Sequence, residues 1–292
     1  MKPSCPNSQC DYFQNNRFCK KDGYYFRKDD SRKIQRYKCM NCKRKFSRST
    51  GTLEFGQKKR RINNTLFKIL SSGISLRRSA IVMNVHRTTI DRKLKYLAEK
   101  SRRMHAELLL KIGSQKVERI QFDDLITTEH TKLKPLTISI AVDATTRMIL
   151  GTVVSQIPSF GHLSAISKKK YGRRKSFHKE GLNELFEKIK PVVSPLAEIR
   201  SDEHKLYPEL IDSFFPNANY KRYKGEKAMI AGLGELKKNG RDPLFVINHT
   251  CAMLRANINR LFRRTWCTTK KPQRLEDHLA IYMAFHNSIL IG

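Results

Sequence analysis

The spacing of hydrophobic residues changes along the chain and divides it into three parts. Residues 1–50 carry short apolar runs among cysteines and basic residues. In residues 51–113, apolar residues recur every three or four positions, which is the period of amphipathic helices. From residue 114 to residue 292, apolar runs of strand length alternate with helical periods. The pattern predicts an α+β multidomain protein: a small N-terminal module, a helical region and a larger mixed domain.

The helical region contains three predicted helices. The first apolar stripe stops at residues 71–73, and Ser75 is placed to cap a second, short helix. Four apolar residues of this second segment are expected to face inward: Leu76, Ala80, Ile81 and Val85. A third helix is predicted to begin at residues 86–90 and to continue as far as Leu110. This succession is typical of a helix-turn-helix, although a plain three-helix bundle has the same pattern.

The start of the third predicted helix carries the candidates for reading DNA. In a helix-turn-helix, polar residues at the beginning of the last helix contact base edges. The candidates are Arg87, Thr88, Thr89 and Arg92. The helical region, residues 51–113, is therefore predicted to bind DNA and to connect to the next domain.

The C-terminal part is predicted to hold a mixed sheet with flanking helices. Its first strand, residues 117–124, ends in the carboxylates of Asp123 and Asp124. The later elements are two strands at 136–142 and 148–154, a helix at 180–190, strands at 197–202 and 218–223, and a helix from 246 to 262. This order resembles the ribonuclease H-like arrangement. There, acids on the central first strand and after the fourth strand meet a polar side chain from a later helix.

The charge of the chain indicates its partner. The sequence has 292 residues and a formal net charge of +33. So many uncompensated positive charges repel one another, and binding to a polyanion usually offsets this repulsion. No apolar stretch approaches the ~20 residues that a membrane-spanning helix needs, and the first residues lack the apolar core of a signal peptide. A basic amphipathic helix suited to a membrane surface is also not evident. The sequence therefore predicts a cytoplasmic protein that binds nucleic acid, with no membrane partner.

The cysteines indicate a zinc site. Five of the seven lie in the first 42 residues, and two close pairs, in CPNSQC and CMNC, are separated by the length of a short hairpin. Two such turns suit tetrahedral zinc, because each supplies two thiolates. The preferred ligands are Cys5, Cys10, Cys39 and Cys42, with Cys19 as an alternative fourth ligand. The alternative without metal is a set of reduced structural thiols.

The surroundings of the cysteines point to a DNA-contacting role beyond folding. Residues 17–61 hold 17 Lys or Arg against four Asp or Glu, interleaved with aromatic residues. Cations mixed with stacking faces suit a phosphate backbone. We therefore expect a structural Zn²⁺ in a ribbon, residues 1–50, that also contacts nucleic acid.

Asp123 and Asp202 are the candidates for a catalytic metal site. Two carboxylates at sheet ends repel each other, and Mg²⁺ offsets this repulsion while it activates an oxygen nucleophile for phosphodiester displacement. On spacing alone the inference is weak, since 78 residues separate the two acids. Acids that end strands are also common in surface turns.

Four segments resemble bacterial insertion-sequence transposases of the DDE type, in particular the insertion-sequence-one superfamily and relatives with an N-terminal zinc ribbon. They are QRYKCMNCKRKFS, IQFDDL, RSDEHKLYPEL and INHTCAMLRANINRLFRRTWCTTKKPQRLEDHLAIYMAFHN. The resemblance covers nearly the whole chain. It implies that Asp123 and Asp202 are catalytic aspartates that bind Mg²⁺ or Mn²⁺.

The third catalytic position departs from this family's usual pattern. In the register of the last segment, the catalytic glutamate falls on Asn248, and related insertion-sequence groups carry asparagine there. An amide oxygen can ligate Mg²⁺ but brings no charge. A compensating charge is expected from one of three acids: Glu226, Glu235 or Asp124. His249 is a poor ligand for Mg²⁺, so a structural or proton-shuttling role is expected for it.

Two further basic segments suit a domain that handles DNA. Residues 168–175 hold six cations and are expected to form a loop. Residues 254–274 carry seven cations and no acid. On one continuous helix, four of them would form a loose phosphate-binding stripe: Arg255, Arg260, Arg263 and Arg264. Trp266 is expected in the core.

The resemblance implies a DNA transposase, a Mg²⁺-dependent polynucleotidyl transferase. The ribbon and the helix-turn-helix would bind the ends of a mobile element, and the ribonuclease H-like domain, residues 114–292, would cut and join DNA. Holding two ends implies a homodimer or larger assembly on element and target DNA, within the bacterial nucleoid. The alternatives are a non-catalytic zinc-ribbon and helix-turn-helix protein derived from a decayed transposase, and a repair or replication nuclease of the same fold.

Overall fold

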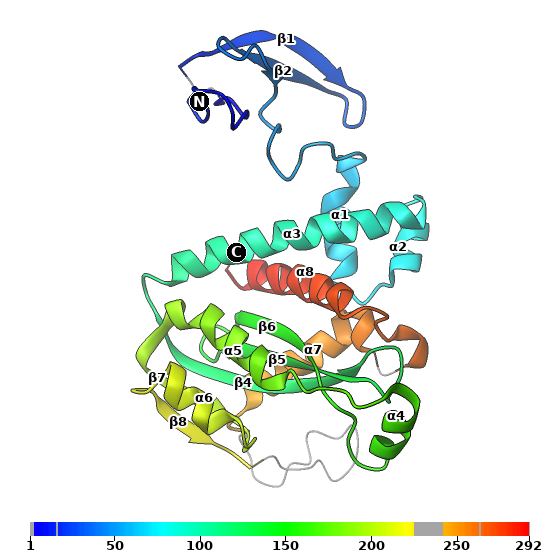
Figure 1. Cartoon of the computed structure of the whole chain (residues 1–292), viewed down its shortest axis with the longest axis vertical. Helices are drawn as coiled ribbons and strands as arrows, with labels where there is room; N and C mark the ends of the chain where they lie inside the picture. The colour runs from blue at the N-terminus through cyan, green and yellow to red at the C-terminus, as the bar shows by residue number, and fades with distance from the viewer. Residues whose placement is uncertain (1–2, 16, 225–241, 263, 292) are drawn as a thin grey trace. The chain divides into compact units, whose positions relative to one another are not determined.

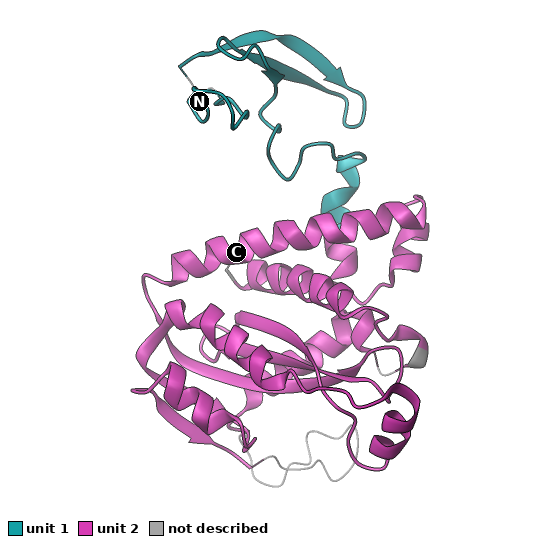
Figure 2. Ribbon diagram, viewed as in Figure 1, with its two compact units in different colours: residues 1–66 teal, residues 67–292 magenta. Residues whose placement is uncertain are grey.

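The computed structural model describes residues 3–15, 17–224, 242–262 and 264–291. The chain divides into two compact units, residues 1–66 and 67–292 (Figure 2). The boundary falls within helix α1 (Asn63–Leu70). The fold is α+β, as predicted, with a cysteine cluster and a small sheet in the first unit and a mixed sheet in the second.

The first unit is built on a three-stranded antiparallel sheet. Its strands are β1 (Cys19–Arg27), β2 (Arg32–Cys39) and β3 (Lys45–Phe46), in that order across the sheet. β1 and β2 form the hairpin expected between the two cysteine pairs, and its turn places Ser31 in the left-handed region with φ 54°. The core is little more than four buried cysteines with Tyr37 and Phe46, whose rings stack with centroids 6.0 Å apart. So small a core needs additional cross-linking to be stable.

The second unit contains a five-stranded mixed sheet (Figure 1). Its strands are β4 (Val117–Thr128), β5 (Pro135–Asp143), β6 (Ile149–Gln156), β7 (Val193–Ser201) and β8 (Asn219–Arg222). The order across the sheet is β6-β5-β4-β7-β8, so the first strand in the chain is the central one. β4, β5 and β6 are antiparallel, whereas β7 and β8 are parallel to β4 and to each other.

The first strand is longer than predicted. β4 does not end at the carboxylates but continues to Thr128, because Leu125 is buried and the ladder with β5 runs on to Thr128 opposite Pro135. Asp123 therefore lies within the strand, beyond the last residue that pairs with β7. Neighbouring residues of a strand face opposite sides of the sheet. Asp123 and Asp124 thus belong to different sides.

Helices cover both sides of the sheet and enclose two separate cores. One core packs β4 and β7 against α5 (His178–Ile189) and α6 (Tyr207–Phe214). The other packs β5 against α7 (Phe245–Asn257) and α8 (Pro272–Ile291). α5 approaches β6 very closely at Gly181, where a Cβ atom would lie 1.9 Å from Ser155 Oγ. Asp123 faces the side of α7, and Asp124 faces the side of α5 and α6.

Two basic segments differ from the predictions. α4 (Leu163–Tyr171) includes half of the segment 168–175 that was expected to be a loop. α7 ends at Asn257 because Ile258 is extended, with φ −108° and ψ 106°, and short 3-10 turns follow at Asn259–Leu261 and Thr265–Cys267. The arginine stripe expected on one continuous helix is therefore wrong. Trp266 is 77% exposed and does not belong to the core.

The predicted helices of the 51–113 region are present. α1 is followed by α2 (Leu76–Val82) and by the long α3 (Arg87–Ile112). Ser75 caps α2 as expected, since its hydroxyl accepts a hydrogen bond from the backbone N–H of Arg78. α3 packs along α8, and the turn after α1 is fixed by a bond from the Gly73 N–H to the Asn257 carbonyl. Ile81 is 66% exposed, so its expected inward orientation is wrong. None of the described helices is long and apolar enough to cross a membrane.

Candidate metal sites

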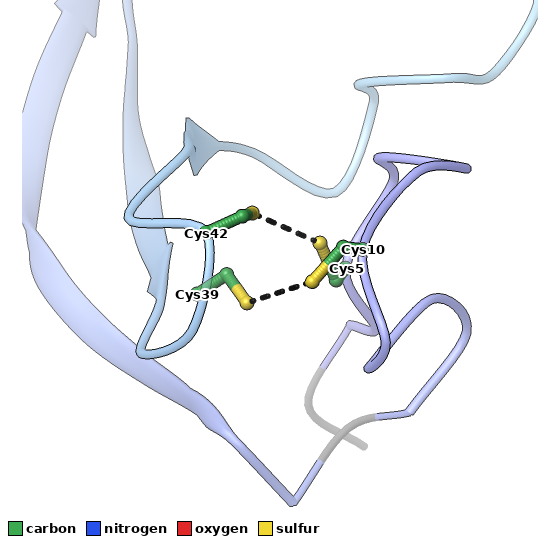
Figure 3. Close-up of side chains that lie close together, drawn as sticks. All are labelled: Cys5, Cys10, Cys39 and Cys42. Atoms are coloured by element: carbon green, nitrogen blue, oxygen red, sulfur yellow. Dashed lines mark hydrogen bonds between the residues drawn. The ribbon is translucent and has the colours of Figure 1, made fainter.

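The four preferred cysteines converge in the first unit. The Sγ atoms of Cys5, Cys10, Cys39 and Cys42 all lie within 4.8 Å of one another. Cys5 faces Cys42 at 3.7 Å and Cys10 faces Cys39 at 3.9 Å (Figure 3). Cys39 ends β2 and Cys42 follows in the next turn, which a bond from the Cys39 N–H to the Arg44 carbonyl closes. The hairpin thus carries the second pair of cysteines to the first.

The sulfur spacing fits a zinc ion. Four sulfurs about 2.3 Å from a tetrahedral zinc lie about 3.8 Å from each other, which is close to the two distances in the cluster. A disulfide would require a much shorter separation, of about 2 Å. Cys19 is buried nearby, but its thiol is 3.8 Å from the Asn15 carbonyl and it is outside the four-sulfur group. These four cysteines could hold Zn²⁺.

The thiols of the cluster differ in acidity. A backbone N–H from Arg44 and contacts with the neighbouring sulfurs lower the pKa of Cys42 to about 6, whereas burial raises the pKa of Cys5 to about 12. Four thiolates held close together without a cation are unfavourable, because their negative charges repel one another and burial removes them from water. Metal binding by this cluster would release protons and would contribute directly to folding.

In the second unit, strand register brings Asp202 beside Asp123. In the parallel ladder, Ile120 pairs with Ile199 and Gln121 with Arg200. The same register, extended by two residues, places Asp202 opposite Asp123 and on the same side of the sheet, and hydrogen-bonded strands lie about 4.8 Å apart. Asp202 follows the last residue of β7, and its Oδ1 accepts a bond from the His204 N–H at 3.1 Å. In this register the two acids lie at adjacent positions of neighbouring chain segments.

Asp123 is buried and lies within the electrostatic influence of Asp202. Burial, followed by the negative charges of Asp202 and Asp124, raises the pKa of Asp123 to about 7, although the Asp124 N–H and Arg255 act in the opposite direction. A carboxylate that is buried beside another acid is one that a cation would stabilise. Asp123 and Asp202 have the donor chemistry that Mg²⁺ prefers.

α7 passes over this pair of acids. Asn248, Cys251 and Arg255 follow each other at helical spacing on one face. Burial and the charge of Asp123 raise the pKa of Cys251 to about 12, and Arg255 acts on Asp123 as a nearby positive charge. The face of α7 that bears Asn248 is therefore directed to the side of the two acids.

Asn248 has a carboxylate partner that the sequence analysis missed. Its exposed side chain donates from Nδ2 to Oδ2 of Asp242 at 2.8 Å, and Oδ1 of Asp242 accepts the N–H of Leu244 at 2.9 Å. An Asp-Pro pair before a helix is a recognisable start signal, and it could have identified Asp242. The candidates Glu226 and Glu235 lie outside the described residues. His249 is exposed and stacks on Phe245, with centroids 5.7 Å apart.

Protein donors already occupy both carboxylate oxygens of Asp124. Its Oδ1 accepts bonds from the hydroxyls of Thr137 and Ser139, at 3.1 and 2.5 Å. Its Oδ2 accepts bonds from His178 Nε2 and the Tyr207 hydroxyl, both at 2.6 Å. Burial opposes ionisation, but these donors hold the pKa of Asp124 below its usual range. Asp124 therefore contributes negative charge near Asp123, but four protein donors on the other side of the sheet already occupy its oxygens.

The expected DNA-contacting residues have different environments. Arg87, Thr88 and Arg92 are exposed at the start of α3, and Thr89 is half-buried. Thr88 is within hydrogen-bonding distance of the capping ring of His86, at 2.9 Å from Nδ1.

The expected arginine stripe is divided between interior and surface. Arg255 lies beside Asp123, and Arg264 is exposed over the ring of Trp266. Arg260 is directed inward, to His278 Nδ1 at 3.0 Å and Thr269 Oγ1 at 3.4 Å, so its guanidinium serves packing rather than a surface stripe. Arg263 lies outside the described residues.

Comparison with known protein families and with curated proteins identifies no relative of the chain. The resemblance to transposases therefore depends on the quoted motifs, and the site depends on the geometry described above.

Proposed function

We propose that this protein is a transposase whose second unit cuts and joins DNA with the help of Mg²⁺ or Mn²⁺. The observation that carries the proposal is the register that places Asp202 beside Asp123 on the side of the sheet that α7 covers. A central first strand with an acid, and a second acid directly after the fourth strand, are the features expected of a ribonuclease H-like domain.

The side chains of this site would hold the cation and orient the DNA. Asp123 and Asp202 supply two carboxylates, and Asn248 supplies an amide oxygen, since its amide nitrogen is bonded to Asp242. Bound there, Mg²⁺ would favour attack by water or a 3′-hydroxyl on a phosphodiester and would stabilise the leaving oxygen. Asp242 contributes negative charge next to the neutral amide. Arg255 is placed to contact a phosphate close to the acids.

The first unit and the helices α2 and α3 would select the DNA. A Zn²⁺-bearing ribbon with exposed Tyr24, Tyr25 and Phe26 among basic residues suits phosphate and base-stacking contacts. The exposed polar residues at the start of α3 suit contacts with base edges. The partners are double-stranded element ends and target DNA, held by a homodimer or larger assembly.

A strand-transfer assay tests the proposal. The substrates are the DNA sequences that flank the gene, examined first for inverted repeats, with a supercoiled plasmid as target and Mg²⁺ or Mn²⁺ as the cation. The wild type is expected to join DNA, and Asp123→Asn and Asp202→Asn to lose more than about 100-fold of this activity. Asp212→Asn, an exposed acid on α6, is the matched control and should retain it.

The outcomes separate three functions. Joining by the wild type but not by Asp202→Asn excludes the non-catalytic DNA binder. Binding of the ends without any joining favours that binder, for which the absent third carboxylate at Asn248 is the specific argument. Cleavage of branched or nicked DNA with no preference for flanking repeats indicates a nuclease instead.

A further inference from the structure

A basic pocket lies beyond the end of β6, away from the paired acids. It has a volume of about 690 Å³, within the range of small-ligand pockets. Its wall is formed by residues 158–159, by α4 and by the segment 172–176 that leads into α5. The lining contains four cations, Lys168, Arg173, Arg174 and Lys175, and four serines, Ser159, Ser164, Ser167 and Ser176. No acid is among the described residues that line it.

Arg174 is the unusual member of this pocket. Only 10% of its side chain is exposed, and its Nη1 lies 3.7 Å from Oε2 of Glu129, which is a long ion pair. Its Nε and Nη2 are buried with no hydrogen-bond partner in the part of the chain that the structure describes. An unpaired donor of a charged group is costly when it is buried. Nε and Nη2 lie on the same edge of the guanidinium, and this edge can donate to two oxygens of one anion.

We propose that this pocket is a phosphate-binding site that holds a backbone phosphate of DNA. Arg174 would bind the phosphate through Nε and Nη2, and the exposed Arg173, Lys168 and Lys175 would add positive charge. The hydroxyls of Ser159, Ser164 and Ser176 supply further donors, whereas the hydroxyl of Ser167 already donates to the Leu133 carbonyl at 2.7 Å. The inference deepens the proposed function, on which it rests for the identity of the polymer. A free phosphate has the same chemistry and is distinguished by experiment.

The distance between the paired acids and the pocket is one that a continuous DNA strand can span. Asp123 pairs with Ile140, which pairs with Thr152 of β6, and β6 ends four residues later at Gln156. Two strand spacings of about 4.8 Å and four residue rises of about 3.3 Å give roughly 16 Å. Gln156 is tied to the pocket because its Nε2 donates to the Lys175 carbonyl at 3.0 Å. One strand of a duplex carries a phosphate for every ~3.4 Å of helix axis, so the separation from Asp123 to Gln156 corresponds to at most about five nucleotides of DNA lying along it.

The salt dependence of DNA binding tests this inference. The full-length protein is titrated with a 30-base-pair duplex of arbitrary sequence, without added divalent cation, over a range of NaCl concentrations. Loss of one phosphate contact is expected to reduce the slope of log K against log[salt] by about 1 in Arg174→Gln. Arg173→Gln should show the same direction of change, and because Arg173 is exposed this variant is not expected to disturb the fold. Lys190→Gln, an exposed cation at the opposite end of α5, is the matched control.

Inorganic phosphate is the second probe. If the pocket binds phosphate, its addition should raise the melting temperature of the wild type more than that of Arg174→Gln. Unchanged slopes in both pocket variants overturn the DNA assignment, and a phosphate-dependent shift in that case identifies a site for free phosphate. No slope change and no shift overturn the site itself. Because neither measurement requires catalysis, a protein that fails to join DNA can still pass this test, and one that joins DNA can fail it.

Discussion

Asp123 and Asp202 occupy neighbouring positions on β4 and at the end of β7, although 78 residues separate them in the chain. The parallel ladder between these strands places both carboxylates on the side covered by α7. Burial makes ionisation of Asp123 less favourable, and the negative charge of Asp202 adds to this effect. The fold thus holds two carboxylates close together, and a bound divalent cation would stabilise their ionised forms.

Replacing Asp123 should make the free protein more stable at alkaline pH. The pKa of Asp123 is about 7 in the folded chain and near 4 when unfolded, so the folded chain binds this proton more tightly. The stabilisation is full below about pH 4 and is lost as pH rises through 7. Asp123→Asn is expected to raise the free energy of unfolding by about 2–4 kcal/mol at pH 8, with little effect at pH 4.

The same variant should lose its response to Mg²⁺. A cation that binds only the folded protein raises stability with its concentration. Urea unfolding at pH 8 with and without MgCl₂ is expected to show stabilisation of the wild type and of Asp212→Asn, but not of Asp123→Asn. An equal response of all three proteins would contradict a cation site at Asp123.

Asp124, by contrast, should be required for stability. It binds donors from β5, α5 and α6, so Asp124→Asn leaves some of these buried groups mismatched. A loss of about 2–4 kcal/mol is expected at pH 7. Because the folded pKa is lowered, this stabilisation is present above about pH 4 and is lost as pH falls through the folded value. Urea titrations at pH 7 and at acidic pH, with Asp212→Asn as the reference, measure both effects; an unchanged stability at pH 7 would show that the network contributes nothing.

The four-cysteine cluster should bind one zinc ion per chain. Removal of a ligand in Cys39→Ser is expected to abolish zinc retention, measured by elemental analysis of the purified protein, and to make residues 1–66 sensitive to protease. Cys19→Ser should retain the metal, because Cys19 is outside the group of four sulfurs. Cys267→Ser, far from the cluster in sequence, controls for loss of any thiol. Zinc loss in Cys19→Ser alone would require a different ligand set.

A side chain at Gly181 should destabilise the contact between α5 and β6. An alanine Cβ would lie 1.9 Å from Ser155 Oγ and 3.1 Å from its Cβ, so the Ser155 hydroxyl would have to rotate away and α5 and β6 would have to separate slightly. Gly181→Ala is expected to cost about 1–3 kcal/mol. In the double variant with Ser155→Gly, much of this loss should be recovered, since the opposing atoms are removed. Additive losses in the double variant would locate the strain elsewhere.

Arg92 should contribute to the sequence specificity of DNA binding. Arg92 is exposed in the first turns of α3, so Arg92→Ala is expected to reduce affinity for element ends by about 1–3 kcal/mol more than affinity for arbitrary DNA. Competition binding with both DNAs measures this difference. Lys111→Ala, exposed at the other end of α3, is the matched control. An equal loss on both DNAs would assign Arg92 to the phosphate backbone.

Much of the local organisation is determined by the sequence itself. The two cysteine pairs lie in short turns separated by one hairpin, so their convergence depends on only a few dozen residues. Ser75 caps α2 because a cap depends on its immediate neighbours. Hydrophobic periods, which adjacent residues create, predict the five strands of the sheet in their order together with α5 and α7, but not α4, α6 or α8. Asp202 stands directly after a strand that the sequence predicts, whereas Asp123 was expected at the end of its strand and lies within β4.

Other features were decided only by the tertiary structure. Alternation along β4 separates Asp123 from Asp124, but only the packing of α7 on one side and of α5 and α6 on the other gives them different chemistry. Likewise α7 ends at Asn257, which turns Arg260 inward, and Trp266 remains outside although its hydrophobicity predicted burial. The buried, unpartnered nitrogens of Arg174 depend on α4 and the segment after it. Hydrophobic periodicity and helix capping depend on residues that are close together in the sequence, so the sequence reveals them directly. The partners of a residue across the fold depend on contacts between distant segments, which no local pattern encodes.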